Sequence, residues 1–390
     1  MPGPLSGVKV VELVQKGPGA FVTMMLADMG ADVIKVEAPS REGESGSGGS
    51  SNVADARAQA ANIVNRGKRS LVLDLKTKRG QTVLQELARR TDVVVEGFRP
   101  GVTARLSADY ETLRVGNQRL IYCSLSGYGQ DGPYRDLPGH DINYIAMAGI
   151  LNLIGERGKP PIVPLNFIAD FGGAALHAVA GIVMALFARE RTGAGQLVDI
   201  AYLDTALSLL APSRFIREYL AEGAQVQRGT GALSGGFPYY AVYETKDAKY
   251  ISVGCIEPWL WENLCNAIDR PDLIDAGLQP GDFTGEESEQ QVWCRKELDR
   301  IFKTRPRDEW FELLAGANVC VGKVYEIPEL FDDPQLKHRQ MVPRLPHPEM
   351  GEVRQIGIGI KLSDTPGSIR GFAPWKGQHT DEILAELGYS

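Results

Sequence analysis

Two short segments of the chain hold residue types that could move a proton. Residues 139–144 read Gly-His-Asp-Ile-Asn-Tyr, and residues 164–173 read Pro-Leu-Asn-Phe-Ile-Ala-Asp-Phe-Gly-Gly. The first segment contains His140, one of only five histidines, and the second contains Asp170. An imidazole and a carboxylate brought together by the fold could form a site with two bases for proton transfer.

Each candidate base also has a plain structural interpretation. Asp170 stands where an apolar helix begins, and capping a helix is the commonest role of an aspartate there. The alternative role is a base or a nucleophile, which Gly172 and Gly173 favour because small residues let a ligand approach the backbone. His140 could equally be a hydrogen-bonded loop histidine. A third carboxylate, Glu257, fits a first helical turn and a functional role equally well.

The helix after Asp170 must hold this carboxylate in place. Its apolar residues recur at helical spacing and predict one buried stripe, made of Leu176, Val179, Val183 and Leu186. Arg189, Arg191 and Gly193 are typical of a helix end. His177 lies among apolar neighbours within the helix, so we interpret it as a core residue.

The N-terminal part predicts a parallel sheet. A strand over 8–13, a helix over 21–29 closed by Gly30 and a strand over 31–37 form a β-α-β unit. A dinucleotide site is rejected, because Val22 stands where the fingerprint needs its third glycine and Pro18 lies inside the motif. Gly17 to Gly19 therefore form the turn that starts the helix, and the scaffold is Rossmann-like.

Cations near the ends of later strands are candidates for holding a phosphate. Lys68 and Arg69, with Arg66 just before them, precede a short strand over 71–73. Arg99 follows a strand over 92–96, at the carboxyl edge where open α/β sheets bind ligands. Another strand over 120–125 ends in a glycine-rich turn. The Ser- and Gly-rich residues 39–56 predict a flexible loop.

The chain is long enough for two domains. We expect a large Rossmann-like domain over 1–215, completed by a return over 335–390, and a small α+β domain over 225–330. The small domain is predicted to hold a hairpin over 237–255 and a helix over 307–314. Residues 354–361 alternate in period two and predict a strand, and the terminal residues form a capped helix expected to pack on the large domain.

Composition narrows the class of protein. The net charge of −7 over 390 residues argues against nucleic acid as the main partner. No apolar run reaches the roughly 18 residues of a membrane span, and the first residues resemble no secretory signal, so we expect no membrane association. The five cysteines are scattered without a Cys-x-x-Cys pair, which favours a reduced cytoplasmic protein without a metal site.

These residues resemble a known family nearly end to end. The chain is similar to the family III CoA-transferase superfamily, also called CaiB/BaiF, which contains carnitine CoA-transferase and alpha-methylacyl-CoA racemase. The similarity is carried by residues 5–13, 30–37, 68–70, 73–76, 97–101, 192–196 and 377–380. Within the superfamily, residues 139–144, 164–173 and 254–258 resemble the racemase branch.

The resemblance implies a fold, a site and an assembly. It implies His140 and Asp170 as the two acid/base residues, with Glu257 paired to the histidine. It implies an interlocked homodimer in which Glu257 acts across the interface. Coenzyme A is implied as part of the substrate, with no further cofactor, and its implied site consists of Lys68, Arg69, Leu73, Asp74, Leu75, Lys76, Gly97, Arg99, Asp141 and Tyr144.

A racemase in this family would remove the proton beside a thioester carbonyl and return one to the opposite face. Histidine suits this role through its ordinary pKa of about 6.5, whereas the pKa of an aspartate must be raised, for example by burial. A helix that starts at Asp170 would offer amide N–H groups to the enolate oxygen, but its dipole would lower the aspartate pKa. The rival is a CoA-transferase with Asp170 as nucleophile, which does not need His140. A non-enzymatic acyl-CoA-binding regulator would leave the His/Asp/Glu set unexplained.

Overall fold

The computed structural model describes residues 2–14, 17–40, 53–225 and 227–389. The chain falls into two compact units. The large unit contains residues 1–148, 165–208 and 331–390, and the small unit contains residues 149–164 and 209–330. Residues 149–164 and 209–215, which we expected in the large domain, belong to the small unit. Most of the Ser- and Gly-rich loop lies outside the described residues.

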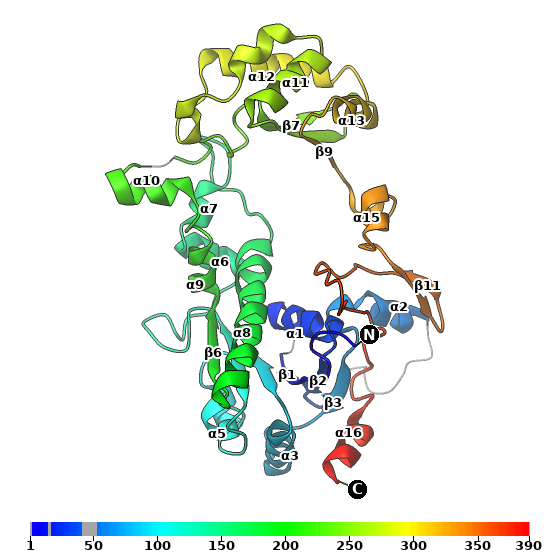
Figure 1. The fold of residues 1–390 in the computed structure, drawn as a ribbon. Helices are drawn as coiled ribbons and strands as arrows, with labels where there is room; N and C mark the ends of the chain where they lie inside the picture. The colour runs from blue at the N-terminus through cyan, green and yellow to red at the C-terminus, as the bar shows by residue number, and fades with distance from the viewer. Residues whose placement is uncertain (1, 15–16, 41–52, 226, 390) are drawn as a thin grey trace. The chain divides into compact units, whose positions relative to one another are not determined.

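A six-stranded parallel sheet forms the centre of the large unit (Figure 1). Its order is β3-β2-β1-β4-β5-β6, the doubly wound order of the Rossmann fold, so the predicted Rossmann-like scaffold is confirmed. In such sheets ligands bind at the carboxyl ends of the strands where the order reverses, here between β1 and β4. The strands are β1 (Lys9–Leu13), β2 (Asp32–Glu37), β3 (Arg69–Val72), β4 (Val93–Glu96), β5 (Ile121–Ser126) and β6 (Leu197–Ala201).

The sequence predicted the strands that are buried and flanked by turns. Five of the six were expected to within two residues at each end; β6 was missed, because Asp199 interrupts its short apolar run. The strand predicted over 354–361 is wrong beyond Arg354. A short hairpin of β10 (Arg344–His347) and β11 (Gly351–Arg354) ends there, and residues 355–361 form no strand.

Helices cover both faces of the large sheet and hold its core. α16 packs beside β3, where Thr380 Oγ1 accepts a hydrogen bond from Val72 N at 3.1 Å (Figure 1). The helices of this unit are α1 (Pro18–Asp28), α2 (Val53–Ala61), η1 (Ile63–Asn65), α3 (Lys78–Arg89), α4 (Val102–Arg105), α5 (Tyr110–Arg114), α6 (Asp141–Met147), η2 (Phe167–Ala175), α8 (Leu176–Thr192), α9 (Tyr202–Ser208), α15 (Pro334–His338) and α16 (Thr380–Leu387).

The central helix of the large unit begins as a π-helix. η2 covers Phe167–Ala175 and continues directly as α8, which ends at Gly193 with a left-handed φ of 72°. The predicted buried stripe is half right: Val179 and Leu186 pack against the core, whereas Leu176 and Val183 are exposed, and the fully buried face is made of Ala178, Ile182 and Ala185. Small side chains on the buried face allow the helix to lie close to the sheet.

The same helix is the one described segment that is long and apolar enough to cross a membrane by length and composition. It spans residues 167–192 with a mean hydropathy of 1.9 over its most apolar window. Its small buried side chains belong to the core that packs against β1, β4 and β5, and 33% of that window is buried in the structure.

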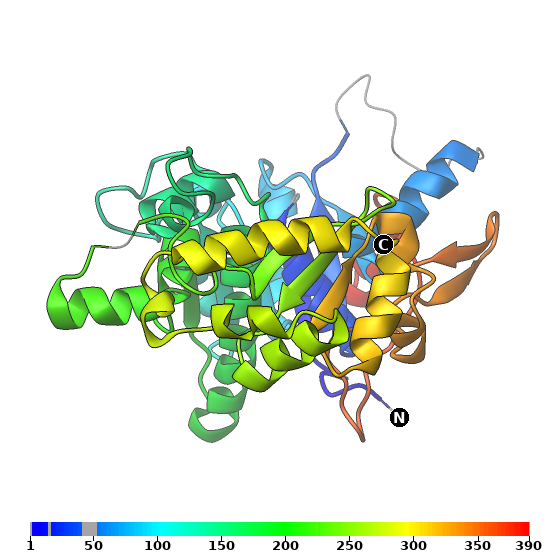
Figure 2. The same ribbon diagram turned by 90° about the horizontal axis from the view of Figure 1, so that it is seen from above.

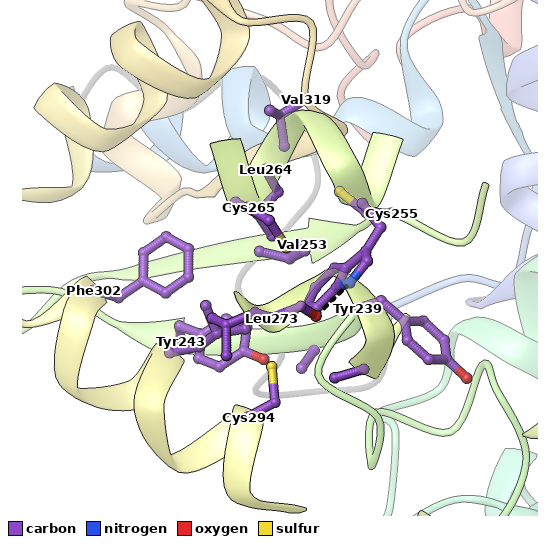
Figure 3. Close-up of a cluster of buried hydrophobic side chains, with 14 of the residues drawn as sticks. Tyr239, Tyr243, Val253, Cys255, Leu264, Cys265, Leu273, Cys294, Phe302 and Val319 are labelled. Carbon is purple, nitrogen blue, oxygen red and sulfur yellow. Dashed lines mark hydrogen bonds between the residues drawn. The ribbon is translucent and has the colours of Figure 1, made fainter. Parts of the chain in front are cut away.

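The small unit is a three-stranded antiparallel sheet covered by helices. Its order is β7-β8-β9, and the predicted hairpin is confirmed as β7 and β8. In Figure 2, α12 lies over the strands, and Figure 3 shows the apolar core between them, including Tyr239, Tyr243 and Phe302. The elements are α7 (Ile150–Leu153), α10 (Arg214–Glu222), β7 (Tyr240–Glu244), β8 (Tyr250–Gly254), α11 (Pro258–Ala267), η3 (Pro271–Ala276), η4 (Pro280–Phe283), α12 (Glu289–Phe302), α13 (Arg307–Gly316), β9 (Val321–Val324) and α14 (Ile327–Leu330).

Candidate active site

His140 stands at the start of α6, outside the first helical turn. Its backbone N–H donates to Asn143 Oδ1 at 3.1 Å, and its carbonyl accepts from Asn143 N at 2.8 Å. These bonds satisfy the helix start without using the imidazole, which makes no capping hydrogen bond. The residue is exposed, so its ring is available for chemistry.

The next residue, Asp141, ties this helix start to the second predicted segment. Its Oδ2 accepts hydrogen bonds from the backbone N–H of Ala169 at 2.7 Å and of Asp170 at 2.9 Å. Asp141 is only 2% exposed, and such charge-assisted bonds are among the stronger ones in proteins. Because His140 adjoins Asp141 in the chain, these bonds hold His140 and Asp170 in one site.

Asp170 lies in the first turn of η2 rather than at its N-cap. The N-cap is Asn166, whose side-chain amide donates to Asp170 Oδ2 at 3.1 Å. The amides of Ala169 and Asp170 already donate to Asp141, so these two are not free to bind an enolate oxygen as predicted. π-turns within helices occur frequently at functional sites. Gly173 permits the turn, since a side chain there would approach Thr205 Oγ1 to 3.2 Å.

Burial sets the acidity of Asp170. Partial burial raises the pKa of its carboxyl; the hydrogen bond from Asn166 opposes this rise, the Asp141 carboxylate adds to it, and nearby His140 opposes it. The net direction is upward, so burial outweighs the opposing contacts. A carboxyl with a raised pKa takes up and releases a proton closer to neutral pH, as an acid/base residue must.

Tyr144 forms the wall next to both candidate bases. Its ring fits between Gly127 and Gly139, where an added Cβ would come within 2.9 and 2.6 Å of it. It stacks on Tyr202 with centroids 5.1 Å apart. Burial raises the pKa of Tyr144 to about 12, with further contributions from Tyr128 and Asp170, so its hydroxyl stays protonated and can donate.

Arg99 lies on the ligand edge of the sheet, as predicted. It follows β4 in an exposed turn, and no ion pair of its guanidinium is present among the described residues. It lies close enough to Tyr144 to oppose the rise in that tyrosine's pKa. A free guanidinium beside the candidate bases could hold a phosphate or a carboxylate. Gly97, in the same turn, is also exposed.

The predicted phosphate ligand Lys68 has a different environment. Its side chain is fully buried, and its ammonium donates to Glu12 Oε2 at 2.7 Å, to Ala20 O at 2.9 Å and to Asn65 Oδ1 at 3.2 Å. Burial lowers the pKa of Lys68, against the opposing effect of Glu12. An ammonium has three N–H donors, and all three are in use. In this conformation Lys68 presents no donor to a phosphate.

Arg69 is also held by internal partners. Its guanidinium forms a two-pronged pair with Asp32 and binds Glu382 and Glu386 of α16. Asp32 is the first residue of β2, so this cluster faces the amino edge of the sheet, away from the Arg99 turn. The cluster fastens the C-terminal helix to the sheet.

The remaining predicted coenzyme A segment, Leu73 to Lys76, follows β3. Leu73 and Asp74 line a pocket of about 470 Å³, together with Thr77, Arg79 and residues of α16. Leu75 is partly buried and Lys76 is exposed. Their roles in binding stay predictions.

Glu257 belongs to the small unit, where it is the N-cap of α11. Its side chain makes no capping hydrogen bond and is exposed. Its backbone carbonyl accepts the first bonds of the helix, from Leu260 and Trp261. The carboxylate is therefore free of the helix cap. Its pairing with His140 stays a prediction.

Two residues of the candidate site were not predicted from the sequence. Asn166 holds the Asp170 carboxylate, and its position four residues earlier in the same segment was the available signal. Tyr202 completes the aromatic wall from α9, and no pattern in the sequence pointed to it. Among the described residues, no group of three or more His, Cys, Asp or Glu side chains could hold a metal ion.

Comparison with known proteins identifies the family. The sequence model of the family described as CoA-transferase family III matches residues 5–380. The chain belongs to this family. It is 35% identical to human alpha-methylacyl-CoA racemase, covering 99% of this chain and 94% of that protein. It is also 35% identical to the formyl-CoA:oxalate CoA-transferase of Streptomyces avermitilis, covering 98% and 95%.

A solved structure has the same fold. The crystal structure of a CAIB/BAIF family protein from Brucella suis matches with a TM-score of 0.81 and 31% identity, covering 99% of this chain and 100% of that one. The chain is therefore an acyl-CoA-handling enzyme of this family. Racemases and transferases are similar to it to nearly equal degrees, so identity alone does not separate the two reactions.

Proposed function

We propose that the protein is a racemase or epimerase of 2-methylacyl-CoA thioesters. The observation that carries the proposal is the pair of hydrogen bonds from Ala169 and Asp170 N–H to Asp141, which join the helix start bearing His140 to the turn bearing Asp170. This arrangement supports two bases in one site, and a transferase nucleophile alone would not need the imidazole.

The reaction needs two steps with balanced protons. One base takes the proton from the carbon beside the thioester carbonyl, and the bonding electron pair moves to the carbonyl oxygen as an enolate. The other base, in its acid form, then gives a proton to the opposite face of that carbon. His140 and Asp170 fill these roles, and the raised pKa of Asp170 suits it to exchange a proton closer to neutral pH.

Coenzyme A binds through the Arg99 turn in this proposal, because Arg99 is the free cation beside the bases. Leu73 and Asp74 offer a second contact region in their pocket. Glu257 acts on the imidazole from a second copy of the chain. Exposed apolar side chains on α8, such as Met184 at 69% and Phe187 at 64%, are compatible with a homodimer.

A family III CoA-transferase is the second candidate. The equal similarity to the Streptomyces avermitilis transferase favours it, and Asp170 is the residue that would attack the thioester. The carboxylate would displace CoA to give an acyl anhydride, and the returning thiolate would release the acid and leave an aspartyl thioester.

Two assays decide between the candidates. In deuterium oxide, a racemase puts deuterium on the alpha carbon of a 2-methylacyl-CoA with no acceptor acid present, and His140→Ala and Asp170→Ala both abolish this. A transferase instead converts an added carboxylate to its CoA ester, and hydroxylamine traps an enzyme-bound acyl group. The second result would replace the racemase proposal.

A further inference from the structure

A second buried carboxylate lies at the same edge of the sheet as the candidate bases. Glu96 is the last residue of β4 and is only 3% exposed. Among the described residues it has no ion pair. A buried carboxylate without a cation is costly unless its oxygens are hydrogen-bonded, so its partners indicate why it is there.

The first partner is the turn that carries Arg99. Glu96 Oε2 accepts a hydrogen bond from the backbone N–H of Phe98 at 2.8 Å. Phe98 directly precedes Arg99, and the carbonyl of Arg99 in turn accepts from Val102 N at 3.1 Å. The carboxylate therefore fixes the backbone from which the free guanidinium extends.

The second partner leads towards His140. Glu96 Oε1 accepts from the Ser124 hydroxyl of β5, and Ser124 Oγ accepts from Gln130 Nε2 at 2.7 Å. Gln130 lies in the loop over 127–139, which ends directly before His140. One carboxylate thus reaches two backbone segments, one bearing Arg99 and one leading to the imidazole.

The groups around Glu96 are acids. Asp199 of β6 contributes to its electrostatics, and Glu96 in turn acts on Tyr122 and Cys123 of β5 and on Tyr202 of α9. Burial raises the pKa of Glu96 to about 7; the bonds from Ser124 and Phe98 oppose this rise and Asp199 adds to it. Burial also raises the pKa of all three neighbours on β5 and α9, so they stay neutral when Glu96 ionises.

We propose that Glu96 is a positioning residue that holds the Arg99 turn and the 127–139 loop together by accepting both hydrogen bonds as a carboxylate. Hydrogen bonds to an ionised acceptor are roughly twice as strong as neutral ones. A protonated Glu96 oxygen would donate to Ser124, whose own hydrogen then loses its acceptor. The consequence for acyl-CoA chemistry rests on the proposed function, whereas the positioning itself does not.

Amide hydrogen exchange of the ligand-free protein tests the proposal. Local openings that break the bonds to Glu96 while it stays buried should, after correction for the intrinsic pH dependence, make wild type exchange about fivefold faster at pH 6 than at pH 8 in peptides covering 97–101 and 127–139, as expected for the loss of about one hydrogen bond. Global unfolding solvates the carboxyl and has the opposite pH dependence. Glu96→Gln keeps an acceptor for Phe98 and a donor for Ser124 but cannot ionise, so its exchange should not depend on pH. Glu111→Gln, an exposed charge removal on α5, should behave as wild type.

Ser124→Ala separates the contact of Glu96 with the 127–139 loop from its contact with the Arg99 turn. It removes the hydroxyl that Glu96 Oε1 and Gln130 share and leaves the bond from Phe98 to Glu96 Oε2 in place, so the pH effect should vanish in 127–139 and persist in 97–101. The proposal is overturned if wild type and Glu96→Gln show the same pH dependence, or if Ser124→Ala leaves 127–139 as in wild type. Should Glu96→Gln fail to fold, Ser124→Ala carries the test. If the wild-type protein puts no deuterium into the substrate but shows this amide-exchange pattern, the proposed function is rejected and the positioning role of Glu96 stands.

Discussion

The cations before β3 and the groups around η2 were predicted for the same site, but they differ in their partners. Lys68 and Arg69 are held by internal partners, Lys68 by one carboxylate and two neutral oxygens and Arg69 by three carboxylates. Arg99 and the His140 imidazole have no ion pair among the described residues. The difference teaches that a charge in a ligand-binding fold acts on a ligand only when the fold leaves it unpaired. The predictions below test this contrast, starting with the largest effect.

The unpaired bases should dominate activity. His140→Gln and Asp170→Asn should each lower the rate of alpha-proton exchange by about 10²- to 10⁴-fold, because each removes one acid/base group. Exchange is followed by NMR of a 2-methylacyl-CoA in deuterium oxide. His338→Gln and Asp136→Asn, both at exposed positions, are the matched controls. Transfer of coenzyme A to an added carboxylate that survives in His140→Gln and is lost in Asp170→Asn would support the transferase instead.

The paired cations should dominate stability. Lys68→Met leaves Glu12 buried without its cation and should lower the free energy of unfolding by about 3–5 kcal/mol. Urea unfolding measures this change. Arg119→Met breaks an exposed pair with Glu190 and should cost at most about 1 kcal/mol. Equal effects of the two substitutions would remove the distinction between buried and exposed pairs.

Glu96 is intermediate, because it is buried but lacks a cation. Its pKa is raised from 4.5 to about 7, so between these values the native state holds a proton that the unfolded state has lost. Wild-type stability should therefore fall as pH rises through this window, by up to about 3 kcal/mol above pH 7.

Glu96→Gln cannot ionise and should escape this loss. Its free energy of unfolding relative to wild type should rise between pH 4.5 and 7 and then level off, measured by urea unfolding at each pH. A difference that stays constant with pH would mean that Glu96 does not titrate in this range. The predicted rise would mean that the native chain keeps a charge that costs stability, as expected at sites shaped by function.

The smallest effect concerns coenzyme A itself. Arg99→Ala should weaken binding of coenzyme A about tenfold, or about 1.4 kcal/mol, with a reduced dependence on salt. Arg69→Ala should leave the affinity within about twofold and lower only the stability, because Asp32 and α16 lose their partner. Isothermal titration of both variants checks this. If Arg69→Ala weakened the binding of coenzyme A more than Arg99→Ala did, the original interpretation of Lys68 and Arg69 as phosphate ligands would stand.

Patterning predicted the buried strands and the fold, because alternating and continuous apolar runs report burial directly. It was half right at α8, where Leu176 and Val183 are exposed and Ala178 and Ala185 are buried instead. The stripe was placed from the large apolar residues, so a buried face made partly of alanine was missed. The strand over 354–361 failed because alternation alone cannot guarantee a partner strand.

The candidate site was predictable in its reactive groups and unpredictable in their partners. His140 and Asp170 were visible as unusual residue types beside glycines. The bond from Asp170 N to Asp141, which joins them, connects residues 29 positions apart. The same gap in sequence hid the Lys68–Glu12 pair, whose members are 56 positions apart. Charged residues can be recognised in a sequence, but their hydrogen-bond partners far along the chain can be identified only from the structure.

The most direct test uses one stereoisomer of a 2-methylacyl-CoA in deuterium oxide, with the wild-type protein and no acceptor acid. NMR and chiral analysis follow the alpha carbon. Two opposed bases predict that deuterium enters this carbon while optical purity is lost, at comparable rates. An unlabelled substrate of unchanged configuration, together with transfer of coenzyme A to an added carboxylate, would contradict the proposed reaction.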